Sequence, residues 1–157
     1  MGKTLNFIFI VICAVALAGC NEGTDPKDVN AIPIIVVNES TYRAYARILY
    51  DSLAVIDEID GEINGDILHL IVTFLGGCEE QQFEMVAARF INYSLPAQGH
   101  TLLVNSGPAD SCQVETRTAL AFDLTPYREY LQSSGLVKYG PITVGINRGL
   151  FSFSYHY

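Results

Sequence analysis

The chain has 157 residues and a formal net charge of −8, and half of its residues are hydrophobic. This length corresponds to one domain and is sufficient to bury a core without a metal or several disulfides. The excess of acidic side chains argues against a protein that grips nucleic acid or anionic lipid through basic residues. Tyr and Phe number 9 and 8, and together with the β-branched residues they favour strands.

The first 19 residues have the features of a secretion signal. Lys3 supplies a positive charge, and the apolar run that follows, residues 7–18, is too short to span a bilayer. The run ends in Leu17-Ala18-Gly19-Cys20, which resembles the bacterial lipobox. The resemblance implies a lipoprotein precursor that is cleaved before Cys20, with diacylglyceryl on the cysteine thiol and a further acyl chain, such as palmitate, on the new N-terminus. Two or three acyl chains suffice for stable anchoring.

The segment after Cys20 is polar and contains Gly23 and Pro26, which predicts a flexible tether. Asn21 stands where Asp favours inner-membrane retention in the enterobacterial sorting rule, so the resemblance implies an outer-membrane anchor. We therefore expect a signal at residues 1–19, a lipidated N-terminus and tether at 20–32, and a single β-rich domain at 33–157. The membrane, reached through lipid on Cys20, is the first expected partner.

The N-terminal part of this domain begins with an apolar run at residues 34–37, which predicts a short strand. The next segment, residues 39–53, fits two periodicities. Apolar residues at helical spacing favour a helix with Ser40 or Thr41 as its N-cap. Alternating apolar residues from Tyr42 to Tyr50 leave a strand as the alternative.

The middle of the chain reads as a series of strands. Asn64-Gly65 predicts a tight hairpin turn, because both residues tolerate positive φ, and it would join strands at residues 55–63 and 66–75. Gly76-Gly77 then interrupts the chain. The further strands and connections that we expect are a strand at 83–93, a loop at 96–99, a strand at 101–105 and a turn at 106–111.

The C-terminal part begins with an alternating segment, residues 113–124, that predicts a half-buried strand. A short helix follows from Thr125-Pro126, with Gly135 past its end. A hairpin with strands at 142–146 and 150–157 would turn at 147–149. Its aromatic residues share one face, which is typical of a core: Phe151, Phe153, Tyr155 and Tyr157. The expected fold is a mainly β, antiparallel sandwich or barrel-like meander of about six to eight strands with one or two short helices and one disulfide.

Two cysteines remain once Cys13 leaves with the signal and Cys20 is lipidated. Export places Cys78 and Cys112 in an oxidising compartment, which favours a disulfide. In a meander of the expected strands, the turns that hold these two cysteines lie at the same end of the sheet. A bond between them would stabilise the fold by about 3–4 kcal/mol. A reactive thiol at Cys78 and a zinc site are the alternatives, but no neighbouring His or Lys and no paired His motif supports them.

An acidic run, residues 57–66, is the one place that suggests a metal. Asp60, Glu62, Asn64 and Asp66 offer oxygen ligands at alternate positions, as in part of a calcium loop. The twelfth position, where such a loop has a bidentate Glu, holds Ile71. A solvated hairpin explains the same residues, so we treat these four as a weak metal candidate.

The remaining candidates for chemistry are three histidines, His69, His100 and His156. They are scattered, and none is spaced from a second ligand as in a metal site. Neither a nucleophile elbow, a zinc-protease motif nor a phosphate-cradling loop is present. We therefore predict no catalytic residues and no cofactor.

A second resemblance concerns the body of the chain, from Ile59 to Gln132. The stretch FLGGCEEQQF at 74–83, then Cys112, then AFDLTP at 121–126, resembles a pattern of small bacterial envelope lipoproteins of uncharacterised function. The resemblance implies a fold and a location but no activity. A His that often follows the first cysteine in that pattern is replaced here by Gln81 and Gln82. Lysozyme-inhibitor lipoproteins share the size and compartment, but their motifs do not match.

We therefore expect a non-enzymatic envelope lipoprotein that binds an envelope protein or a glycan, or serves the envelope structurally. One alternative is an inhibitor of a hydrolase such as a lysozyme or a protease. The other is a small envelope hydrolase, which would require a pocket that gathers a carboxylate with His69 or His100. An exposed apolar patch or a protruding loop would favour binding.

Overall fold

The computed structural model describes residues 32–51, 56–136 and 141–156. By its contacts the chain divides into two units, Met1–Ala31 and Ile32–Tyr157, and every described residue belongs to the second. Several sequence predictions lie outside the described residues: the signal, the lipidated Cys20, nearly all of the tether, Leu53 and Tyr157.

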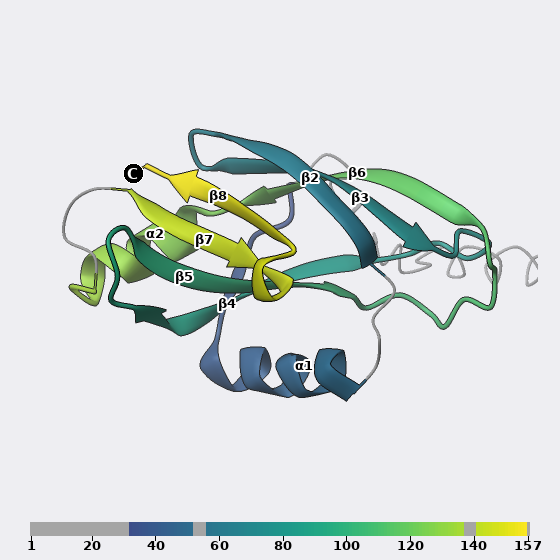
Figure 1. Cartoon of the computed structure of the whole chain (residues 1–157), viewed down its shortest axis with the longest axis horizontal. Coiled ribbons are helices and arrows are strands. Elements are labelled where there is room, and N and C mark those ends of the chain that lie inside the picture. The colour runs from purple at the N-terminus through teal and green to yellow at the C-terminus, as the bar shows by residue number, and fades with distance from the viewer. Residues whose placement is uncertain (1–31, 52–55, 137–140, 157) are drawn as a thin grey trace, which may run out of the picture. The chain divides into compact units, whose positions relative to one another are not determined.

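The domain is mainly β, as the sequence predicts, with two α-helices and one disulfide. Figure 1 shows two sheets, one of five strands in the order β1-β4-β5-β7-β8 and one of three in the order β2-β3-β6. The elements are β1 (Val36–Val37), α1 (Glu39–Asp51), β2 (Ile56–Asn64), β3 (Ile67–Leu75), β4 (Phe83–Asn92), β5 (Ala97–Asn105), β6 (Glu115–Asp123), α2 (Thr125–Ser133), β7 (Ile142–Ile146), η1 (Asn147–Gly149) and β8 (Phe151–Tyr155).

The path of the chain is more complex than a meander within one sheet. Between β3 and β4 the chain passes from the three-stranded sheet to the five-stranded sheet, and between β5 and β6 it returns. Four pairings are antiparallel, as expected, but β1 runs parallel to β4 and β5 runs parallel to β7. Parallel neighbours need a long crossover, and the chain from β6 through α2 supplies it for β7.

The hydrophobic core lies between the two sheets. Alternate residues of β3 are almost fully buried, because this central strand is flanked by β2 and β6 and presents one face to the other sheet. Residues of β7 and β8 meet them from the five-stranded sheet. A second buried layer lies on the opposite face of β4 and β5, which α1 covers: Val86, Ala88, Leu102 and Val104.

The segment that fits two periodicities forms the helix α1, so the helical interpretation is confirmed. Its cap, however, is Asn38 rather than Ser40 or Thr41. The Thr41 backbone amide and the Ser40 hydroxyl both donate to Asn38 Oδ1, at 3.1 and 2.7 Å. An Asn at this place satisfies an amide that the first turn leaves without a partner. Glu39 and Arg43 form an exposed ion pair one turn apart.

The expected loop at residues 96–99 is wrong for three of its four residues, because β5 already begins at Ala97. Gly99 suggested a loop in the sequence, but a glycine stands at this position because of packing. A Cβ on Gly99 would collide with the hydroxyl of the fully buried Tyr127 in α2. A glycine within a strand often marks such a close approach.

The C-terminal elements follow the sequence prediction closely. In α2, Pro126 lies in the first turn, and Gly135 follows the end of the helix with φ of +66°. In the final hairpin, Phe153 and Tyr155 are buried, as expected for a core stripe. Asn147 in the turn has φ of 46°, and its side chain bonds both the N–H and the C=O of Leu103.

Candidate interaction surface

The predicted disulfide between Cys78 and Cys112 is present, with a Cα–Cα distance of 6.0 Å and a sequence separation of 34 residues. Cys78 lies in the β3–β4 connection and Cys112 in the β5–β6 connection, and both connections carry the chain between the sheets. The two cysteines come together as expected, but not at the same end of a single meandering sheet. The disulfide joins two crossings between sheets rather than two turns of one sheet.

Asp110 fixes the geometry of these connections. Its Oδ2 accepts hydrogen bonds from the backbone amides of Gly77, Cys78 and Glu79 at 2.7, 2.9 and 3.2 Å. Its Oδ1 accepts one from the amide of Cys112 at 2.8 Å. These bonds, with Cys112 first, lower the pKa of the Asp110 carboxyl, because they favour its charged form. The carboxylate therefore holds both loops around the disulfide.

A metal at this place is not supported. Among the residues that the structure describes, one group of three metal-ligating side chains comes together, and it consists of Cys78, Asp110 and Cys112. Both sulfurs of the group belong to the disulfide, and the carboxylate is occupied by backbone amides. The arrangement is structural.

The weak calcium candidate is not assembled into a site. Asp60, Glu62 and Asn64 alternate along β2 with exposed side chains, so they lie in a row on the solvent face of a strand rather than around a loop. Asp60 also accepts a hydrogen bond from the amide of Gly61. The fourth residue, Asp66, bonds elsewhere.

Asp66 joins three elements that are distant in sequence. Its carboxylate forms an ion pair with Arg128 of α2 and accepts a hydrogen bond from the hydroxyl of Tyr155 in β8. Tyr155 is fully buried, and burial raises the pKa of its hydroxyl, as do the hydrogen bond and the negative charge of Asp66. The β2–β3 turn is thereby fastened to the other sheet and to α2.

The three histidines lie apart. His69 is exposed on β3, opposite Glu62 of β2, and His156 is exposed and contacts the hydroxyl of Ser154. His100 lies on β5 with its ring 5.3 Å from that of Phe90, and partial burial lowers its pKa. The structure therefore does not gather these histidines with one another.

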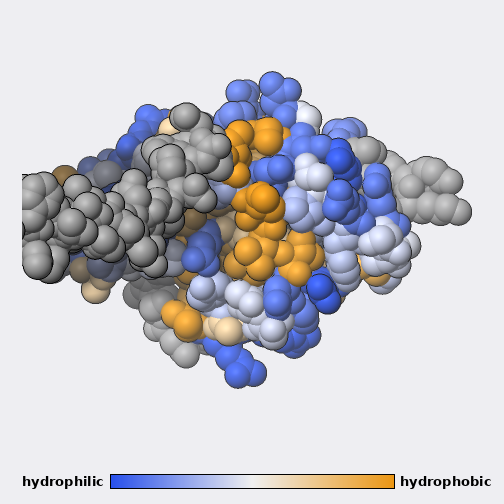
Figure 2. Space-filling view, turned by 180° about the vertical axis from the view of Figure 1, so that it is seen from behind, coloured by the Kyte–Doolittle hydropathy of each residue, from blue (hydrophilic) through white to orange (hydrophobic). Residues whose placement is uncertain are grey.

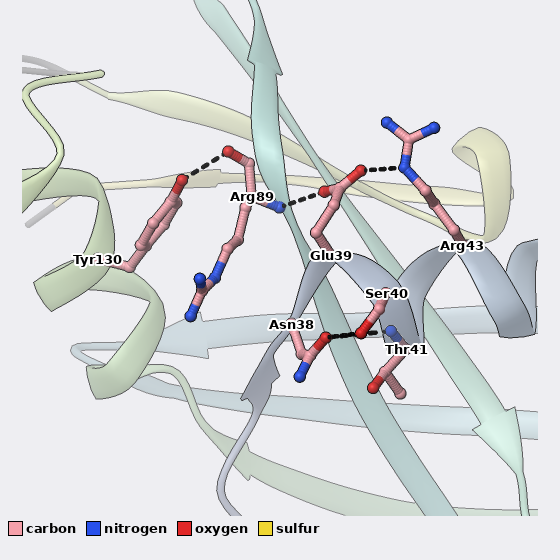
Figure 3. A network of polar contacts seen from close by, with 7 residues as sticks. All are labelled: Asn38, Glu39, Ser40, Thr41, Arg43, Arg89 and Tyr130. Carbon is pink, nitrogen blue, oxygen red and sulfur yellow. Dashed lines mark hydrogen bonds and ion pairs between the residues drawn. The ribbon is translucent and has the colours of Figure 1, made fainter.

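A further polar network surrounds a bulge in β4, where the register against β5 shifts between Ala87 and Ile91. Figure 3 shows that Glu39 of α1 and Tyr130 of α2 approach Arg89 from opposite sides. Glu39 accepts a hydrogen bond from the Arg89 amide at 3.0 Å, and the Tyr130 hydroxyl donates to the Arg89 carbonyl at 2.6 Å. The side chains of Glu39 and Tyr130 thus provide hydrogen-bond partners for backbone groups of β4 at the bulge, where the ladder with β5 is disturbed.

Exposed apolar side chains mark the segment that leads into the domain. Ile32, Ile34 and Val36 have 41%, 61% and 43% of their surface exposed, whereas Ile35 between them is buried. We call these three residues the apolar strip. Strand β1 is the edge strand of the five-stranded sheet, beside β4. Figure 2 shows apolar side chains gathered along the middle of the face opposite to the one seen in Figure 1.

The segment that carries the apolar strip bridges the two sheets. The amide of Ile35 donates to the carbonyl of Asp123 in β6, and the amide of Asp123 donates to the carbonyl of Pro33. Further on, Val36 and Val37 pair with β4. The strip therefore lies where the edge of one sheet passes to the edge of the other.

Sequence reasoning missed the roles of Asp110, Asp66 and Arg128. A local signal existed for Asp110, because an Asp two residues before an amide commonly accepts its hydrogen bond, here from Cys112. No comparable signal existed for Asp66 and Arg128, which are 62 residues apart. For the apolar strip, the sequence predicted only a short strand at residues 34–37 and did not indicate which of its side chains are exposed.

Neither helix of the described residues has the length and apolar character needed to cross a membrane.

No family model matches the chain, and no curated protein matches it. Solved structures do match. A protein of unknown function, DUF1344, from Bacteroides vulgatus has a TM-score of 0.46 and 13% identity over 80% of this chain and 57% of its own. A NigD-like immunity protein from Bacteroides caccae has a TM-score of 0.42 and 14% identity over 79% of this chain and 58% of its own. The chain thus spans less than two thirds of either solved chain.

Proposed function

We propose that this protein is a lipid-anchored binding protein of the bacterial envelope, held in the outer membrane through Cys20, that contacts another envelope protein through its apolar strip. The anchor is inferred from Leu17-Ala18-Gly19-Cys20. The contact is inferred from the exposure of Ile32, Ile34 and Val36, and this observation carries the proposal. Exposed apolar patches commonly mark interaction sites.

The arrangement of charged groups supports binding rather than hydrolysis. The most strongly bonded carboxylates, Asp110 and Asp66, have their partners in the protein itself and hold loops and elements together. Their oxygens are therefore committed to structure. Inhibition of a hydrolase would be one form of such binding, and the identity of the partner decides it.

The position of the strip suits an anchored protein. Ile32 lies 12 residues after Cys20. An extended segment of that length reaches at most about 40 Å, so the strip stays close to the membrane surface. A partner in the same membrane is thus within reach.

The test is site-specific photo-crosslinking of the lipidated, full-length chain in its native envelope. A photoreactive residue replaces Ile34 in one variant and Ser152, which is exposed on β8, in the control. We expect a discrete protein adduct from position 34 and none from position 152. Equal labelling from both positions, or none from position 34, would contradict the proposed contact, and an adduct with a hydrolase that loses activity would identify an inhibitor.

A further inference from the structure

Most of the edge of β6 beside the apolar strip is unpaired by the residues that the structure describes. Strand β6 pairs with β3 over its whole length, from Glu115 opposite Leu75 to Asp123 opposite Ile67. On its other side, the bridge between Ile34 and Asp123 is the one strand contact among the described residues. The described residues therefore occupy this edge at its C-terminal end and leave it unpaired along the rest.

The direction of the backbone groups on this edge follows from the hydrogen bonds of Asp123. Its N–H and C=O bond Pro33 and Ile35, so they point away from β3. In an antiparallel ladder the direction alternates from residue to residue. The outward-pointing N–H and C=O groups on the rest of β6 are accordingly those of Glu115, Arg117, Ala119 and Ala121.

Pro33 weakens the pairing of this segment with β6. To continue the parallel ladder, residue 33 would donate its N–H to the carbonyl of Ala121, and proline has no N–H. The carbonyl of Ala121 therefore receives no hydrogen bond from residue 33.

Strand β6 carries the charged residues Glu115, Arg117 and Asp123 but lacks other usual protections of a free edge. It is nine residues long, contains no proline and shows no register shift against β3. The side chains that point inward, Thr116, Thr118 and Leu120, are only half-buried, so the core is incompletely covered there. An added strand would cover them and would lie beside the exposed Ile32 and Ile34.

We propose that the edge of β6 between Glu115 and Ala121 receives an extended segment of a partner protein, which pairs with it as a fourth strand of the β2-β3-β6 sheet. The inference rests on the proposed function and specifies how the partner is bound. Backbone hydrogen bonds supply the attachment, and alternate apolar side chains of the partner cover Leu120. The occupant is thus about seven residues of extended chain with apolar residues at every second position.

A second copy of this chain fits the edge less well than a separate partner. Each copy carries a net charge of −8, so two copies repel each other. A second β6 would also bring its own Cys112 loop, fixed by Asp110 and the disulfide, toward Pro33. A free segment of a partner brings no such obstacle.

The test introduces proline on the open edge of the lipidated, full-length chain that carries the photoreactive residue at position 34. Ala119→Pro removes an N–H that faces outward, and therefore leaves the β3–β6 ladder intact. Arg117→Pro removes the next outward-facing N–H, two residues away, and serves as a second variant in case Ala119→Pro misfolds. Tyr93→Ala, a change at an 80% exposed residue in the β4–β5 connection, is the control. A retained disulfide and unfolding transition confirm the fold of each variant.

We expect both proline variants to lose about tenfold or more of the adduct, while the control keeps it. Mass spectrometry should place the crosslink in an extended segment of the partner. If the adduct persists in both proline variants, strand addition is wrong although the proposed function stands. An adduct of twice the mass of this chain would make the occupant a second copy. If the chain without proline forms no adduct, the proposed function fails and the strand addition with it.

Discussion

At the scale of single residues, Asp110 accepts hydrogen bonds from backbone amides of both the β3–β4 and the β5–β6 connections. These bonds lower the pKa of its carboxyl in the folded state below the value in the unfolded chain. The stability that it contributes is therefore fully present above the unfolded pKa, near 4, and is lost as the pH falls through the folded pKa. Asp110 thus links the stability of the disulfide-bonded loops to pH.

Replacement of Asp110 tests this link. We expect Asp110→Asn to lower the urea midpoint of unfolding at neutral pH and to weaken its decline below about pH 4, because the variant has no carboxylate to protonate. Glu80→Gln, at an exposed position in the same loop, is the matched control and should follow the natural chain. An unchanged acid profile in Asp110→Asn would show that the amide bonds contribute nothing to stability.

Gly99 shows how a residue can suggest the wrong element. Its lack of a side chain accommodates the Tyr127 hydroxyl, so we expect Gly99→Ala to destabilise the domain by about 1–3 kcal/mol through overpacking. Gly145, in the neighbouring strand β7, is the control, because a Cβ there meets no atom closer than 3.9 Å. Denaturant unfolding of both alanine variants measures the difference, and equal costs would contradict the packing explanation.

At the scale of elements, local patterns predicted most of the structure. The Asn64-Gly65 turn, the Pro126 start of α2 and the C-terminal hairpin all appear at the expected places, since each depends on a backbone preference within a few residues. The cap of α1 and the start of β5 were wrong. The start of β5 depends on a contact that adjacent residues do not reveal, the approach of Tyr127 to Gly99. The cap is a local contact, but Asn38, Ser40 and Thr41 all have side chains that can cap a helix.

Strand β6 allows a direct test of the alternation on which the open edge depends. Thr118 faces β3 with its N–H, whereas Ala119 faces outward, so the same substitution has opposite consequences at adjacent positions. We expect Thr118→Pro to cost about 2–3 kcal/mol of unfolding free energy and Ala119→Pro less than about 1 kcal/mol. Urea unfolding compares them, and a larger cost at position 119 would reverse the assigned direction of the edge.

At the scale of the whole molecule, the disulfide connects two passages between the sheets, the β3–β4 and the β5–β6 connections. In the chain-entropy model, closing a loop of this length stabilises the fold by about 3–4 kcal/mol. We expect the double variant Cys78→Ser, Cys112→Ser to lose about this much in denaturant unfolding, with dithiothreitol producing the same loss in the natural chain. A double variant as stable as the natural chain would show that Asp110 alone holds the loops.

The sequence could predict the pairing of Cys78 with Cys112 but not the sheets that the two connections join. Strand alternation shows which residues face inward, but it carries no information on which of two sheets a strand enters. The contact of Asp66 with Arg128 and Tyr155 is hidden for the same reason, because it exists only after both sheets and α2 have packed. The position of the apolar strip beside β6 depends on the pairing of Pro33 with Asp123, which the sequence does not reveal.

In the proposed function, Cys20 holds the domain at the membrane so that the apolar strip meets its partner there. The most direct measurement compares the natural chain with Cys20→Ser, each with the photoreactive residue at position 34, in membrane and soluble fractions of irradiated cells. We predict that the natural chain is found in the outer membrane with its adduct, and that Cys20→Ser is soluble with little adduct. An equally membrane-bound Cys20→Ser chain with the same adduct would contradict the account.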